Sequence, residues 1–157
     1  MEVFMTWNDL RKGRFSHEYE EYFITFNTHN REPYFNDFND FNSAQLFAQQ
    51  ITANETKNKC AWLTWVLMPD HFHGLLCINP NGSALSKTIK GLKGSSSFII
   101  NKEYKRQKQF WQPSFYDRAL RADEDRKSVA RYILANPLRK GLVDNISDYP
   151  FWNSVYL

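Results

Sequence analysis

The chain has 157 residues, of which 42% are hydrophobic, so it can form one domain whose core closes without disulfides. Its two cysteines, Cys60 and Cys77, are too few for a disulfide framework or a zinc-ribbon pattern. No apolar run near the N-terminus precedes a small-residue cleavage site, and no stretch approaches a membrane span. We therefore expect a cytoplasmic protein with no membrane partner.

The net charge of +3 is unevenly distributed along the chain. Residues 82–140 contain 14 Lys or Arg and 5 Asp or Glu, a balance of +9, whereas the rest of the chain carries −6. Such a basic stretch favours one face that binds a polyanion. The alternative is the solvated surface of ordinary helices, and composition alone leaves both interpretations open.

The first half of the chain is predicted to contain three strands and one helix, after a polar lead-in. The lead-in covers 1–20, the strands cover 22–28, 61–68 and 72–78, and the helix covers 42–51. The strands are rich in β-branched and aromatic residues, and Asn42 or Ser43 can cap the helix. Pro69 and Asp70 separate the second and third strands closely enough to make them a hairpin.

The second half is predicted to contain two helices around a fourth strand. A basic helix begins at Ser83 or Ser86, the strand covers 110–111 and 115–120, and the last helix covers 122–136. Acidic residues at 123–125 suit the start of that helix because they oppose its dipole, and Pro137 is expected to end it.

The resulting order is β-α-β-β-α-β followed by one further helix. This is the order of the ferredoxin-like split βαβ fold, an α+β architecture with an antiparallel sheet. The sequence contains no repeat, low-complexity tract or linker. We therefore predict a single domain over residues 1–157.

The His71-Phe72-His73 triplet opens the third predicted strand. Residues two apart on a strand point to the same face, so the two histidines project together and Phe72 projects to the other side. Two imidazoles about 7 Å apart along a strand can hold one divalent cation if a further ligand comes from elsewhere. The alternative is a pair of sheet-surface histidines without a metal.

Tyr132 and Asn136 lie four residues apart on the last predicted helix, and therefore one turn apart on the same face. A tyrosine beside a metal can attack a phosphodiester and form a covalent phosphotyrosine link. Asn136 could then supply an oxygen ligand. The alternative is that Tyr132 is a half-buried core residue beside Val129 and Ile133.

Four segments together resemble one known family. They are MPDHFHGLL at 68–76, FWQ at 110–112, FYDRALR at 115–121 and ARYILANPLRKGLV at 130–143. In this order they resemble the single-tyrosine HUH transposases of the insertion-sequence-200 type. The most similar branch is that of the REP-associated tyrosine transposases, and the resemblance covers about residues 20–145.

The resemblance implies a ferredoxin-like catalytic domain with Mg²⁺ or Mn²⁺ that acts on single-stranded or hairpin DNA. Cleavage would pass through a 5′-phosphotyrosine and leave a 3′-hydroxyl for rejoining. His71 and His73 match the metal ligands, and Tyr132 matches the nucleophile on the additional C-terminal helix. Asn136 stands where the insertion-sequence enzymes often carry a Gln ligand. A homodimer is compatible with this interpretation.

Tyr116 is a rival nucleophile. Only one of Phe115 and Tyr116 can face the metal on an alternating strand, and sequence does not fix the register. We favour Tyr132 because it lies inside the helical segment that carries the resemblance. Two other functions stay open, a non-catalytic nucleic-acid-binding domain on the same fold and an inactive descendant of a transposase.

A set of basic residues could hold the DNA backbone. Three lysines recur at three-residue spacing on the basic helix, and three arginines lie near the proposed site in sequence. They are Lys87, Lys90, Lys93, Arg118, Arg121 and Arg131.

Overall fold

The computed structural model describes residues 20–36 and 42–157. The predicted polar lead-in at 1–20 thus lies almost entirely outside the described residues. The elements are β1 (Glu20–Asn27), η1 (His29–Arg31), α2 (Asn42–Asn58), β2 (Cys60–Met68), β3 (His71–Ile78), α3 (Leu85–Glu103), β4 (Tyr116–Ala119), α4 (Arg126–Leu134), α5 (Asn136–Arg139), η2 (Ile146–Asp148) and β5 (Trp152–Ser154). The order of the first six major elements confirms the predicted split βαβ fold.

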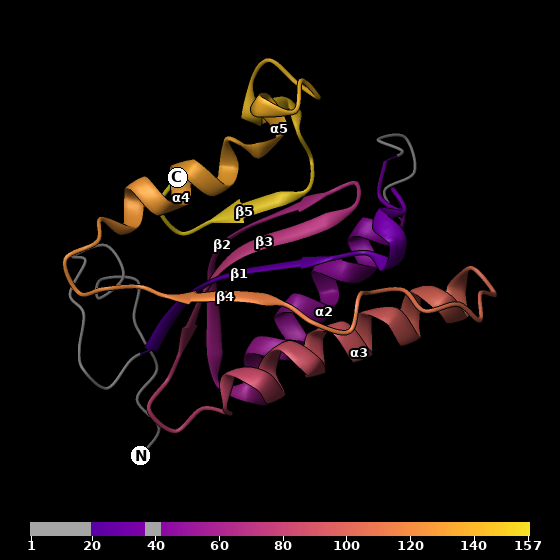
Figure 1. The fold of residues 1–157 in the computed structure, drawn as a ribbon, viewed down its shortest axis with the longest axis horizontal. Coiled ribbons are helices and arrows are strands. Elements are labelled where there is room, and N and C mark those ends of the chain that lie inside the picture. The colour runs from indigo at the N-terminus through magenta and orange to yellow at the C-terminus, as the bar shows by residue number, and fades with distance from the viewer. Residues whose placement is uncertain (1–19, 37–41) are drawn as a thin grey trace.

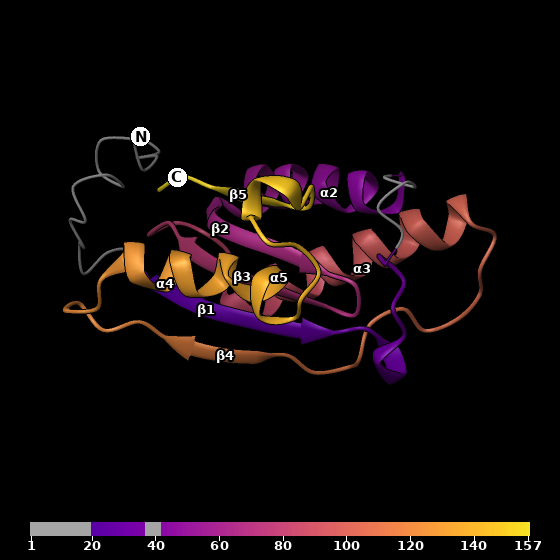
Figure 2. The same cartoon turned by 90° about the horizontal axis from the view of Figure 1, so that it is seen from above.

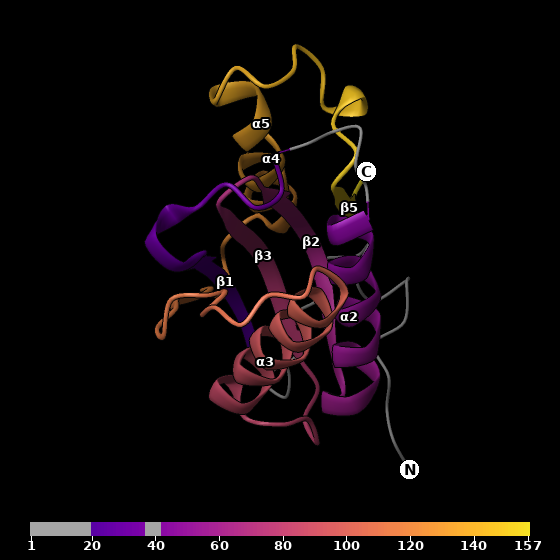
Figure 3. The ribbon, with the colours of Figure 1, turned by 90° about the vertical axis from the view of Figure 1, so that its right-hand side faces the viewer.

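The strands form one sheet in the order β4-β1-β3-β2-β5, and every neighbouring pair is antiparallel (Figure 1). Helices α2 and α3 cover one face of this sheet, and α4 lies on the opposite face (Figures 2 and 3). On this second face of the sheet, α4 contacts the central strands β2 and β3. None of the described helices is long and apolar enough to cross a bilayer.

Phe72 anchors the central strand in the core beneath α2. Its ring centroid lies 4.8 Å from that of Phe26 on β1 and 5.2 Å from that of Phe47 on α2. Phe72 is fully buried. Because side chains alternate along β3, burial of Phe72 on the α2 side directs its two neighbours to the α4 side.

The predicted fourth strand is shorter than expected, because only its second part forms β4. Trp111 makes a single bridge to Thr28, and its indole packs in the core with Nε1 donating to Ser96 Oγ at 3.0 Å. The Lys93 ammonium donates to the carbonyls of Gln112 and Ser114. These carbonyls therefore accept from a side chain instead of a neighbouring strand. The β-ladder is interrupted at this point, and β4 begins only at Tyr116.

The end of the last helix also differs from the prediction. Helix α4 ends at Leu134, two residues before Asn136, and Pro137 lies in the first turn of the short helix α5 instead of ending α4. A proline fits that place because the first residues of a helix need no N–H donor. The three-residue strand β5 was not predicted, since so short a segment carries almost no alternation signal.

Gly74 provides a test of the packing in this sheet. It lies two residues after Phe72, and a Cβ there would come within 2.7 Å of the Trp62 ring. Trp62 cannot easily move, because its Nε1 donates to Asn54 Oδ1 at 3.0 Å. We predict that Gly74→Val lowers the free energy of unfolding by about 1–3 kcal/mol in urea titrations.

Gly94→Ala is the matched control. Gly94 lies in α3, and a Cβ at this position would meet nothing within 4 Å. Alanine should therefore stabilise the helix by about 0.5–1 kcal/mol. A Gly74→Val protein as stable as the wild type would contradict the proposed contact with Trp62.

Candidate active site

His71 and His73 lie side by side at the start of β3. Their ring centroids are 4.6 Å apart. The pairing places His71 opposite Asn27 and His73 opposite Thr25 on β1. His71 is buried and His73 half-buried, so the pair does not lie on open surface.

Each histidine has a fixed orientation, because its Nδ1 already has a partner. His71 Nδ1 lies 2.7 Å from Asp70 Oδ1, and His73 Nδ1 lies 2.7 Å from Thr25 Oγ1. Asp70 is itself held by the Nε of Arg31 at 3.0 Å. Metal-binding histidines commonly use one ring nitrogen for such a partner and the other for the metal. The remaining atom on both rings is Nε2.

The surroundings favour neutral imidazoles. Burial lowers the pKa of His73 to about 3, and the charges of His71 and Arg139 act in the same direction. Burial also lowers the pKa of His71, although its hydrogen bond with Asp70 opposes this. A histidine must be neutral to offer a lone pair to a metal, so both rings are in the form that a ligand requires.

Asn136, the residue predicted as a third ligand, is the first residue of α5. It is buried, and its Nδ2 donates to the carbonyl of Ile133 at 3.0 Å, which leaves Oδ1 as the amide atom for other contacts. The prediction that it shares a helix face with Tyr132 is wrong, because α4 ends at Leu134 and Tyr132 is exposed. Among the described residues, no cluster of three His, Cys, Asp or Glu side chains could hold a metal. Two imidazoles and an amide oxygen are nevertheless donors of the kind that bind a divalent cation completed by water or phosphate oxygens.

Tyr132 lies on the exposed face of α4, with 59% of the residue accessible, and is not the core residue that the alternative interpretation required. Its ring centroid is 6.1 Å from that of Phe23, which in turn is 5.8 Å from the His73 ring. The Arg139 guanidinium lies 4.4 Å above the Tyr132 ring and donates to the Tyr132 carbonyl at 3.0 Å. Phe23 thus contacts both the Tyr132 ring and the His73 ring, and Arg139 contacts the phenol as well.

The rival Tyr116 shares the same side of the sheet. It pairs with Thr25, so its side chain projects to the face that His73 occupies. It is 57% exposed. Both tyrosines line one pocket of about 460 Å³ between β4 and α4. The fold therefore brings the two candidates together.

The predicted DNA-binding cations occupy different environments. Lys87, Lys90 and Arg131 are exposed. Arg118 pairs with Glu124 at 2.8 Å, and the exposed Arg121 pairs with Asp123 at 3.4 Å. Lys93 differs, because it is buried and its ammonium donates to the carbonyls of Gln112 and Ser114. It therefore supports the fold and does not lie on an open surface where DNA could bind.

Sequence reasoning missed several neighbours of the histidines. Arg31, Arg139 and Lys140 lie close enough for their charges to act on His73. Arg139 and Lys140 follow Asn136 by three and four residues, so helical spacing could have indicated them. Arg31 and Thr25 are distant from the histidines in sequence. The pairing of β1 with β3 brings Thr25 to His73, and Arg31 reaches the site through its ion pair with Asp70.

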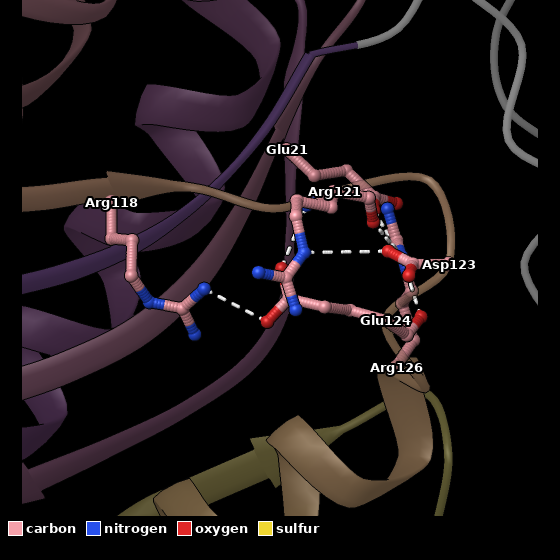
Figure 4. Close-up of polar contacts among 6 residues, drawn as sticks. All are labelled: Glu21, Arg118, Arg121, Asp123, Glu124 and Arg126. Atoms are coloured by element: carbon pink, nitrogen blue, oxygen red, sulfur yellow. Dashed lines mark hydrogen bonds and ion pairs between the residues drawn. The ribbon is translucent and has the colours of Figure 1, made fainter.

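A buried ion pair fixes the start of α4 to the sheet (Figure 4). Arg126 Nε lies 2.5 Å from Glu21 Oε2 on β1, and both side chains are about 95% buried. Arg126 Nη1 also donates to the carbonyls of Arg121 and Glu124. This contact joins β1, the loop after β4 and α4, and so sets where the helix that carries Tyr132 lies.

Comparison with known proteins identifies the family. The family model described as "Transposase IS200 like" matches residues 17–136, a range that contains both histidines, both tyrosines and Asn136. The chain belongs to this family. A REP-associated tyrosine transposase of Escherichia coli strain K12 is 29% identical over 87 residues, which cover 55% of this chain and 50% of that protein.

A further curated relative, from Haemophilus influenzae, is 28% identical over 94 residues and is matched over 53% of its length. The chain thus spans about half the length of the curated relatives that it matches. The solved structure of a REP-associated tyrosine transposase bound to a REP hairpin superposes with a TM-score of 0.72 and 24% identity. That match covers 88% of this chain and 79% of the other, and shows that the fold is shared.

The Glu21–Arg126 pair yields a prediction about stability. Glu21→Gln leaves the buried guanidinium without its counter-charge, so we expect the free energy of unfolding to fall by about 3–5 kcal/mol in chemical denaturation. The double variant Glu21→Met with Arg126→Met should recover much of the loss, because no charge stays buried.

The exposed Arg121–Asp123 pair is the control. Arg121→Ala should change stability by less than about 1 kcal/mol, since solvent screens exposed ion pairs. Equal losses for Arg121→Ala and Glu21→Gln would show that burial of the Glu21–Arg126 pair does not matter.

Proposed function

We propose that this protein is a metal-dependent single-stranded DNA endonuclease and strand transferase with Tyr132 as its nucleophile. The observation that carries the proposal is that one ring, Phe23, contacts both the exposed phenol of Tyr132 and the ring of His73 in the histidine pair. The Arg139 guanidinium also lies over the Tyr132 ring. Family membership supports the same chemistry.

The cleavage step follows from the chemistry of a phenol. The Tyr132 oxygen attacks the phosphorus of a phosphodiester, and the bond from phosphorus to the 3′ oxygen breaks. The 3′ oxygen takes up a proton and leaves as a hydroxyl, while the phenol proton passes to solvent at the exposed helix face. A 5′-phosphotyrosine results. Attack by a 3′-hydroxyl on this link reverses the step and joins two strands without another energy source.

Three residues would hold a divalent cation, Mg²⁺ or Mn²⁺. They are His71 and His73 through Nε2, and Asn136 through Oδ1. When bound, the metal would polarise the scissile phosphate and orient it for in-line attack. The charges of Arg139 and Lys140 act on the histidines, so both cations lie near enough to bind phosphate oxygens there.

Two variants test the identity of the nucleophile. The protein is incubated with Mn²⁺ and single-stranded hairpin oligonucleotides covering the DNA beside its own gene, and denaturing gels detect covalent adducts. Tyr132→Phe should abolish the adduct because the attacking oxygen is gone, whereas Tyr116→Phe should retain it. Chelation of the metal should abolish it in the wild type. Metal-independent binding without any adduct would favour the non-catalytic alternative.

The partners of the two histidines give a second test, read directly as metal affinity. We predict that Asp70→Asn and Thr25→Val each weaken Mn²⁺ binding by about 10–100-fold in calorimetry. Each substitution weakens or removes the contact that fixes the orientation of one imidazole, His71 in the first case and His73 in the second. Asp123→Asn, which changes an exposed carboxylate that contacts neither histidine, serves as the control. Unchanged affinity in both test variants would refute this role for the Nδ1 contacts.

A further inference from the structure

A pocket next to Tyr132 is not used by the cleavage step described above. It lies between β4 and α4 and encloses about 460 Å³. Strand β4 is at the end of the sheet order, so the pocket lies at the sheet edge (Figure 1). Its lining consists of Phe23, Tyr116, Arg118, Ser128, Val129 and Tyr132.

We propose that this pocket binds one base of the single-stranded DNA, from a nucleotide adjacent to the scissile phosphate, and that Tyr116 is the ring on which the base stacks. The inference rests on the proposed function, since it takes Tyr132 as the group that attacks the phosphate. It gives Tyr116 a role in binding in place of the nucleophilic role.

The state of the Tyr116 ring is the first argument. Tyr116 is 57% exposed at the edge of the sheet, and no aromatic ring stacks on it among the residues that the structure describes. Its pairing with Thr25 directs it to the α4 face, toward the pocket. A large ring with an open π-face beside a cation, here Arg118 in the same pocket lining, is the group that single-stranded nucleic acid uses for stacking.

The position of the pocket is the second argument. Tyr132 is part of its wall, so a base held there belongs to a nucleotide close to the phosphate that Tyr132 attacks. Phe23, which also lines the pocket, contacts the His73 ring. A base in this pocket would therefore fix the DNA strand relative to both the nucleophile and the histidine pair, which is the positioning that in-line attack needs.

The polar groups of the pocket are the third argument. Arg118 pairs across the strands with Phe23, and its Cζ lies 6.0 Å over the Phe23 ring. Glu124 holds Nη1 of Arg118 at 2.8 Å (Figure 4). A guanidinium has five N–H donors, so others stay available for acceptors on a base edge or for a phosphate oxygen. The lining thus combines apolar ring and aliphatic surface with an arginine that Glu124 orients and with the hydroxyls of Ser128 and the two tyrosines, as expected for a base pocket.

The first experiment measures DNA binding without cleavage. Fluorescence anisotropy in the presence of chelator gives the affinity for labelled single-stranded oligonucleotides, with oligo-dT as the sequence-neutral probe. Tyr116→Ala should weaken binding by about 5–100-fold, the range for loss of one stacked base. Tyr116→Phe should bind as the wild type does, because the ring is kept. Phe98→Ala, which removes a 71% exposed ring from α3 outside the pocket, should also bind normally.

The second experiment asks whether Tyr116 contacts one particular base. An abasic position is moved along the oligonucleotide that the wild type cleaves. One position next to the cleaved bond should weaken binding to the wild type and have no further effect on Tyr116→Ala. The same loss in both proteins, or wild-type affinity of Tyr116→Ala, would overturn the base pocket.

These outcomes separate the pocket from the proposed function. Absence of any adduct, with oligo-dT binding that still depends on the Tyr116 ring, would refute catalysis and retain the pocket as a site for single-stranded DNA. A normal adduct, with DNA binding that does not depend on the Tyr116 ring, would support catalysis and refute the pocket. If Tyr116→Phe loses the adduct and Tyr132→Phe keeps it, Tyr116 is the nucleophile and the inference is wrong.

A fluorescent base tests stacking in the wild type without any variant. A 2-aminopurine placed next to the cleaved bond should be quenched when the protein binds, and unchanged fluorescence would contradict stacking.

Discussion

Burial of Phe72 is the constraint on which the rest of the site depends. Its ring packs against Phe26 and Phe47 under α2, and strand alternation then directs His71 and His73 to the opposite face. A slip of one residue in the register of β3 would bury the histidines in the aromatic core and expose Phe72. The energy that fixes the register is thus hydrophobic, although its consequence is the placement of two polar side chains, the candidate metal ligands.

The other half of the site comes from α4, which needs its own attachment to the sheet. The Glu21–Arg126 ion pair fixes the N-terminal end of the helix, and the contact between Phe23 and Tyr132 fixes a later turn. Because Glu21 and Phe23 both belong to β1, one strand positions the helix. The same strand supplies Thr25 to His73, so it connects the proposed nucleophile to the histidines.

Most of the fold could be predicted from local pattern. Aromatic and β-branched runs gave the first three strands, and the split βαβ order followed from them. Two errors have physical reasons. Trp111 reads as part of a strand because it is aromatic, but its indole is buried beside Ser96 and it makes a single bridge. Lys93 belongs to a lysine-rich helix face by spacing, but its ammonium points inward to two backbone carbonyls.

The sequence by itself determined the relations that have a short period. His71 and His73 share a face because strands repeat every two residues. The matching prediction for Tyr132 and Asn136 is wrong, because α4 ends at Leu134, and Asn136 begins α5 and is buried whereas Tyr132 is exposed. Only the tertiary structure decided that Tyr116 and Tyr132 line one pocket, that Thr25 holds His73, and that Arg31 holds Asp70. These residues lie on different elements. Their contacts follow from strand order and register, which depend on how the whole core packs.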